Sequence, residues 1–103
     1  MKTEVAILHH EYPSRIRQHI ADKLENLTRF FDGTVSVRAV LERVHNEHRV
    51  ELISNVRRGV VLRVDARGDS ITSAADDAVG KMGRVLARYK DKLKLGNRRR
   101  PRE

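Results

Sequence analysis

The sequence predicts a single α+β domain in which a four-stranded sheet carries two helices on one face, in the order β-α-β-β-β-α. Apolar residues repeat at helical spacing in two stretches, one on each side of a central region. Within that region, three segments alternate apolar and polar residues and are joined by short polar connections, as in antiparallel hairpins. The length of 103 residues fits one compact core and leaves no room for a second of similar size.

The first strand is expected at residues 3–9 (TEVAILH). Val5 and Ile7 alternate along one face of this segment. Ala6 and Leu8 make the other face apolar as well, and this pattern is typical of a strand buried on both sides. The first strand, the helix after it and the next strand then form a crossover unit, which is right-handed if the two strands are parallel.

The first helix is expected to begin near Pro13 or Ser14, because proline is tolerated in a first turn and serine is a good N-cap. It should run to about Phe31, where Asp32-Gly33 ends it, since glycine accepts the left-handed conformation common at helix ends. Apolar residues spaced three or four apart form its predicted buried face, namely Ile16, Ile20, Leu24, Leu27 and Phe31.

Three further strands are predicted at Thr34 to Val44, His48 to Val56 and Val60 to Ala66. Alternation gives each strand one apolar and one charged face, so the sheet needs a cover on one side only. The residues expected to face the helices are Val35, Val37, Ala39 and Leu41, then Val50, Leu52 and Val56, then Val60, Leu62 and Val64.

A long second helix is predicted from Ser70 or Ile71 to about Gly96-Asn97. Its apolar residues repeat at helical spacing, at Ile71, Ala75, Ala78, Met82, Val85, Leu86, Tyr89 and Leu93. We therefore expect a folded domain over residues 1–96. Residues 97–103 contain no apolar side chain and are expected to form a disordered basic tail.

The positive charge of the chain is concentrated near its C-terminus. The net charge is +8, yet residues 1–79 hold 12 basic and 12 acidic residues, whereas residues 80–103 hold 10 basic and 2 acidic ones. Such an excess favours a polyanionic partner, nucleic acid first and an anionic membrane second. No apolar run approaches the roughly 20 residues of a membrane helix, and Met1 leads into an alternating polar and apolar segment rather than a signal-peptide core, so we expect a cytoplasmic protein. We also expect that it binds no membrane and that the free protein is a monomer.

Four cations of the second helix, Lys81, Arg84, Arg88 and Lys92, fall in a basic stripe about 80° wide on a helical wheel. The stripe borders the buried face, on the side that we expect to lie beside the first helix. At 1.5 Å per residue it is roughly 16 Å long, a reach that suits several backbone phosphates. The alternative interpretation is a solvated helix face whose C-terminal lysines are favoured by the helix dipole.

Neither a metal site nor a cofactor site is predicted. His9 and His10 point to opposite faces of a strand, His45 and His48 lie at a probable hairpin turn, and the chain has no cysteine. Asp69, Asp76 and Asp77 lie near a helix start, where caps and dipole partners are expected. Neither a paired nucleophile and base nor a glycine-rich phosphate loop is present, so we expect no enzyme and no small-molecule substrate.

The segment Lys81 to Leu95 (KMGRVLARYKDKLKL) closely resembles the last helix of the short ribosome hibernation promoting and ribosome-associated inhibitor family, with YKDKLK as its strongest match. Lys23-Leu24, Leu27 and Phe30-Phe31-Asp32 resemble the end of that family's first helix. The resemblance covers roughly residues 2–95 and implies a fold similar to a double-stranded-RNA-binding domain. It also implies a stationary-phase stress factor that binds small-subunit rRNA near the decoding region and inhibits translation by occluding the mRNA and tRNA sites.

By this resemblance, the positions that match rRNA-contacting basic residues of the family are Lys23, Lys81, Arg84, Arg88, Lys90 and Lys92. Two departures stand out. The acidic-Met-Tyr stretch that usually opens the last helix is replaced by Ser70-Ile71-Thr72, and only Asp76 of the following Ile-Asp pair is kept. Gly80 and Gly83 are also expected on the outward side of this helix, where each costs roughly 1 kcal/mol against alanine. We further expect the chain to lack the second, dimerising domain of the family's long form.

Two other functions remain open at this stage. A generic duplex RNA or DNA-binding module would explain the charge but not the YKDKLK match, and it would bind plain duplex RNA that ribosomal subunits cannot displace. A protein-interaction module, such as the sigma-factor modulation once ascribed to relatives of the family, would form a complex that survives nuclease and high salt.

Overall fold

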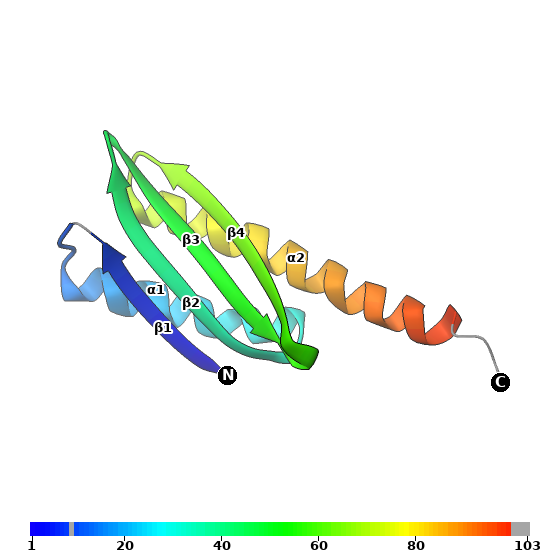
Figure 1. The fold of residues 1–103 in the computed structure, drawn as a ribbon. Helices are drawn as coiled ribbons and strands as arrows, with labels where there is room; N and C mark the ends of the chain where they lie inside the picture. The colour runs from blue at the N-terminus through cyan, green and yellow to red at the C-terminus, as the bar shows by residue number, and fades with distance from the viewer. Residues whose placement is uncertain (9, 100–103) are drawn as a thin grey trace.

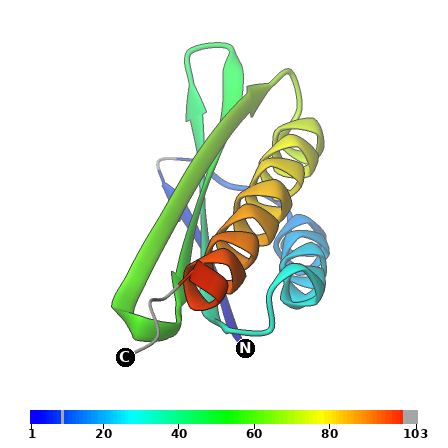
Figure 2. The same ribbon diagram turned by 90° about the vertical axis from the view of Figure 1, so that its right-hand side faces the viewer.

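The structure, a computed structural model, describes residues 1–8 and 10–99, and it confirms the predicted α+β fold and element order (Figure 1). The sheet forms one layer and the two helices form the other (Figure 2). The elements are β1 (Lys2–Leu8), α1 (Ser14–Glu25), the 3-10 helix η1 (Asn26–Phe30), β2 (Thr34–Val44), β3 (Glu47–Val56), the 3-10 turn η2 (Arg57–Gly59), β4 (Val60–Gly68) and α2 (Ile71–Arg99).

The strands of the sheet lie in the order β1-β2-β3-β4, so β1 and β4 are its edges. β1 pairs parallel to β2 through the α1 crossover, whereas the two following pairs are antiparallel hairpins. The register places Val5 opposite Ala39 and Leu52 opposite Val64, which aligns the apolar side chains of neighbouring strands on one face. α1 packs near β1 and α2 packs on β3 and β4, so both helices cover this face (Figure 2).

The core between the two layers contains most of the residues that periodicity predicted. The buried apolar residues are Val5, Ile20, Leu24, Leu27, Phe31, Val37, Ala39, Leu41, Val50, Leu52, Val56, Ala66, Ile71, Ala74, Ala75, Ala78, Met82 and Leu86. Val60, Leu62 and Val64 of the edge strand β4 are only partly buried against this cluster. The predicted inward faces are therefore confirmed for β3 and β4 and for most of β2.

Two strand predictions were wrong. β1 is not buried on both sides, because it is an edge strand whose second face is uncovered, and Leu8 is 40% exposed there. Val35 does not face the helices, because the register between β2 and β3 shifts between Thr34 and Ser36. This bulge leaves Val35 55% exposed and buries Thr34, whose hydroxyl donates a hydrogen bond to the Phe31 carbonyl.

The first helix does not continue to Phe31 as an α-helix. α1 ends at Glu25, the chain tightens into η1, and Phe31 is extended with a φ of −162°. Asn26 and Thr28 disfavour a helix interior, which explains the change to a short 3-10 segment. Leu27 and Phe31 are nevertheless buried. Both residues therefore belong to the core as predicted, although the backbone around them is not α-helical.

The second helix does not stop at Gly96-Asn97 but continues to Arg99, so the predicted end of the helix was too early. A glycine inside a helix costs only about 1 kcal/mol, and the arginines that follow are good helix formers. Residues 100–103 of the expected tail lie outside the described residues. No helix in the described part of the chain is both long and apolar enough to cross a membrane.

The uncovered face of the sheet is charged, as predicted, and its charges balance. Arg49 lies at the centre, with guanidinium nitrogens 2.9 Å from Glu42 Oε1, 3.1 Å from Asp65 Oδ2 and 3.8 Å from Glu51 Oε2. The strand register assigns five basic and five acidic residues to this open face: Lys2, Arg38, Arg49, Arg63 and Arg67, and Glu4, Glu42, Glu47, Glu51 and Asp65.

Candidate nucleic-acid interface

α2 is held against the sheet by one apolar side, and this contact determines where its cations point. Met82 and Leu86 are fully buried, and the ring of Tyr89 lies edge-on to Phe31 with centroids 5.6 Å apart. β3, β4 and η1 all contact the helix. Because these contacts cover one side of α2, the residues on its other side face solvent.

Arg84, Arg88 and Lys92 form an exposed row on that outer side, and we refer to these three residues as the cation row. They follow one another at intervals of four residues. The row therefore spans about 12 Å along the helix axis at 1.5 Å per residue. Among the side chains that the structure describes, none of the three has an ion-pairing partner. Three cations on one rigid frame are thus available to an anionic ligand.

Lys81, the first residue of the predicted basic stripe, is tied to the sheet. Its ammonium nitrogen donates a hydrogen bond of 2.9 Å to the backbone carbonyl of Asp65 on the edge strand β4. The basic stripe therefore runs along the β4 side of α2. The prediction that it lies beside the first helix was wrong. The flank toward α1 and η1 carries Asp76 and Gly83 instead.

Gly83 shows why the stripe cannot face α1. A Cβ atom at this position would lie 3.0 Å from two carbons of the Phe30 ring, so the helix approaches η1 closely there. The expectation that Gly83 faces outward was therefore wrong, because its missing side chain makes room for Phe30. Gly80 is exposed, as expected.

Lys23 of α1 is separated from the cation row by this contact. Its ammonium nitrogen lies 2.6 Å from Asp76 Oδ1 of α2, and the two residues line a hollow of about 300 Å³ between the helices. The structure thus places Lys23 in an interhelical ion pair. An exposed pair of this kind contributes about 0–1 kcal/mol, so it can open at little cost.

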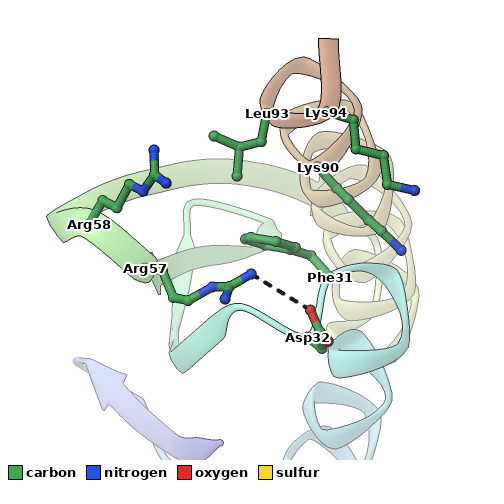
Figure 3. Close-up of a pocket in the computed structure, with 7 residues that line it drawn as sticks. All are labelled: Phe31, Asp32, Arg57, Arg58, Lys90, Leu93 and Lys94. Atoms are coloured by element: carbon green, nitrogen blue, oxygen red, sulfur yellow. Dashed lines mark ion pairs between the residues drawn. The ribbon is translucent and has the colours of Figure 1, made fainter. Parts of the chain in front are cut away.

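Lys90 lies on yet another side of α2, where it lines a pocket together with residues that sequence reasoning missed (Figure 3). Arg57 and Arg58 reach this pocket from η2, the turn between β3 and β4. The only signal in the sequence was two adjacent arginines in a hairpin connection. Of the six predicted contact residues, the structure brings Lys81, Arg84, Arg88 and Lys92 together and places Lys23 and Lys90 apart from them.

His48 of β3 takes part in an aromatic contact with His10 and Tyr12 near the N-terminus of α1. The Tyr12 hydroxyl lies 2.7 Å from His48 Nδ1, and the rings of His10 and Tyr12 are 4.6 Å apart. Burial lowers the pKa of the His48 imidazole, and the positive charges of Arg43 and His10 lower it further. No cluster of three or more metal-type ligands occurs within residues 1–8 and 10–99, and His9 lies outside them.

We expect the folded chain to lose stability as the pH falls below the ordinary histidine pKa of 6.5. Folded His48 binds a proton less readily than unfolded His48, so the unfolding free energy rises with pH through the window below 6.5. Urea denaturation of the wild type and of a His48→Gln variant at several pH values across that window checks this. A pH dependence that is the same in both proteins would contradict the assignment to His48.

A family model described as sigma 54 modulation protein / S30EA ribosomal protein matches residues 4–94. The chain belongs to this family. This match confirms the resemblance to the ribosome hibernation promoting and ribosome-associated inhibitor family that the last helix suggested. Among its relatives is the ribosome hibernation promotion factor of Rhizobium meliloti (strain 1021), which is 30% identical over 95 residues. The match covers 91% of this chain and 50% of that protein, so the chain spans about half the length of its curated relative.

Two solved structures share the S30EA-family fold of this chain. The N-terminal domain of Thermus thermophilus Protein Y superposes with a TM-score of 0.76 at 24% identity, covering 86% of this chain and 99% of that one. A ribosomal subunit interface protein from Coxiella burnetii superposes with a TM-score of 0.80 at 15% identity, covering 88% of this chain and 99% of that one. At these identities, the likeness concerns the fold alone.

Proposed function

We propose that this chain is a noncatalytic ribosome hibernation factor that acts in the cytoplasm. It binds small-subunit rRNA near the decoding region and inhibits translation by occluding the sites of mRNA and tRNA. Family membership and the ribosome hibernation promotion factor among its relatives support the ribosome as its partner. The observation that carries the proposal is the cation row, three exposed basic side chains in line on a helix that the core holds in place.

The cation row suits an RNA backbone because neighbouring carboxylates are scarce. Asp91 is the only acidic residue between positions 78 and 99. Each lysine or arginine that neutralises a phosphate releases condensed counterions, and this release supplies most of the affinity in sequence-independent binding. The helix itself is already folded, so its cations need little ordering on contact.

The aromatic residues favour recognition through phosphates and RNA shape over base stacking. Phe31 is buried in the core, and Tyr12, Phe30 and Tyr89 are at most partly exposed. The described surface therefore offers no row of open aromatic faces on which successive unpaired bases could stack. This agrees with a protein that follows the backbone of folded RNA.

The six predicted contact residues are expected to contribute unequally. Arg84, Arg88 and Lys92 can meet phosphates directly, whereas Lys81 must first leave the Asp65 carbonyl and Lys23 must leave Asp76. Both internal contacts are at the surface, where such interactions are weak. Lys90 would approach RNA from the side of the Arg57-Arg58 pocket.

Binding to purified small subunits should weaken steeply as salt increases. With three to six phosphate contacts, the slope of log K against log salt is expected to be about −2 to −5. Co-sedimentation over a salt series measures this slope, and plain duplex RNA added as a competitor tests specificity. An affinity that does not change with salt would rule out a phosphate-driven complex, and duplex RNA that subunits cannot displace would favour a generic RNA reader.

A further inference from the structure

A second cationic site lies at the end of the sheet where η2 faces the C-terminal part of α2 (Figure 3). It is a pocket of about 420 Å³ lined by Phe31, Asp32, Arg57, Arg58, Lys90, Leu93 and Lys94. Figure 3 shows Arg58 on one side of it and Lys90 and Lys94 on the other, with Leu93 and the Phe31 ring between them.

The pocket has four cations and a single carboxylate. That carboxylate, Asp32, lies 4.0 Å from a guanidinium nitrogen of Arg57, and both side chains are largely exposed, so the pair holds Arg57 only weakly. Arg58, Lys90 and Lys94 have no ion pair with any side chain that the structure describes. The pocket therefore has an excess of positive charge that nothing in the described part of the molecule neutralises.

The backbone of η2 gives an independent reason to look for a function here. Arg58 adopts the left-handed conformation, with a φ of 72° and a ψ of 20°. For a residue with a side chain this conformation costs roughly 1–2 kcal/mol, and glycine or asparagine usually occupies it. The conformation of the turn therefore gives no reason for an arginine at position 58. Backbone strain of this kind often marks a residue whose side chain is needed for function.

We propose that this pocket binds the phosphate of a nucleotide, either within an RNA strand or free in solution. Arginine side chains bind phosphate oxygens through paired N–H donors, and Lys90 and Lys94 add positive charge from the opposite wall of the pocket. The volume lies within the range of roughly 300–1,000 Å³ typical of ligand sites, so the attached nucleoside can lie against Leu93. The site is separate from the cation row but includes Lys90, so for an RNA strand the proposal rests on the proposed function, whereas the binding of a free nucleotide goes beyond it. Both can be tested without ribosomes.

The test uses an Arg58→Gly/Lys94→Gln variant of the full chain. Glycine suits the left-handed backbone at position 58 and Lys94 is exposed, so the fold should survive, as thermal melting can verify. An Arg63→Gln/Arg67→Gln variant, altered on the open face of the sheet, matches the loss of charge. The probes are a short fluorescein-labelled oligouridylate, followed by anisotropy, and ATP, followed by calorimetry.

The pocket variant should bind at least one probe about tenfold more weakly than wild type, while the matched control changes by less than about threefold. A loss for oligouridylate alone assigns the phosphate to an RNA strand, and a loss for ATP assigns it to a free nucleotide. An Arg84→Gln/Arg88→Gln variant should keep ATP binding, which separates this site from the cation row. Equal losses in the pocket and control variants, or no binding of either probe to the wild type, would overturn the proposal.

Discussion

Reversing two charges of the cation row, in an Arg84→Glu/Arg88→Glu variant, is expected to abolish co-sedimentation with small ribosomal subunits. The substitution removes two cation–phosphate contacts and places two anions against the RNA backbone. Each contact to a charged group contributes about 1.5–3 kcal/mol. A factor of ten corresponds to about 1.4 kcal/mol, so the affinity should fall at least a hundredfold.

This loss should not come from unfolding, because both arginines are exposed and have no described ion-pairing partner. Circular dichroism and the urea midpoint should therefore remain close to those of the wild type. An Arg63→Glu/Arg67→Glu variant makes the same change in net charge on the open face of the sheet. If both variants lose binding equally, net charge alone drives association; if neither does, the interface lies elsewhere.

The largest loss of stability is expected from Leu86→Ala. Leu86 is fully buried between α2 and the sheet, so truncation removes apolar contacts and leaves a cavity. Such substitutions typically lower the unfolding free energy by about 2–5 kcal/mol, a large part of the roughly 5–15 kcal/mol that stabilises a domain of this size. Urea denaturation followed by circular dichroism gives this free energy directly.

Leu95 provides the matched control on the same helix. It is 46% exposed, so Leu95→Ala should change the unfolding free energy by no more than about 0.5 kcal/mol. A similar loss in both variants would mean that the C-terminal part of α2 packs more tightly than its exposure indicates. A negligible effect of Leu86→Ala would contradict the packing of α2 on the sheet.

Periodicity predicted much of the fold, because it records which side of each element is apolar. The faces that contain Met82 and Leu86 in α2, and Leu52 in β3, follow from spacing alone, and both are buried. The bounds of β2 follow from alternation between turn signals. Even so, the edge position of β1 was missed, because an apolar second face in the sequence does not show whether another layer covers it.

The composition of the candidate site was less predictable, because a helical wheel orders residues only around the axis of their own helix. It grouped Arg84 and Arg88 correctly, yet it could not show which flank faces β4 and which faces η1. The contact of Gly83 with Phe30 decides that, and it joins segments more than fifty residues apart. The meeting of Arg57 with Lys90 is equally nonlocal, so no local pattern could have predicted the pocket.

The even balance of charge on the open face of the sheet has a consequence for how the molecule travels toward its target. A body that is neutral on one side and strongly positive on the other experiences a torque in the field of a polyanion. Diffusional encounters with RNA should therefore be biased toward arrival helices first, before any side chain touches a phosphate. The balanced side would then be left facing outward after docking.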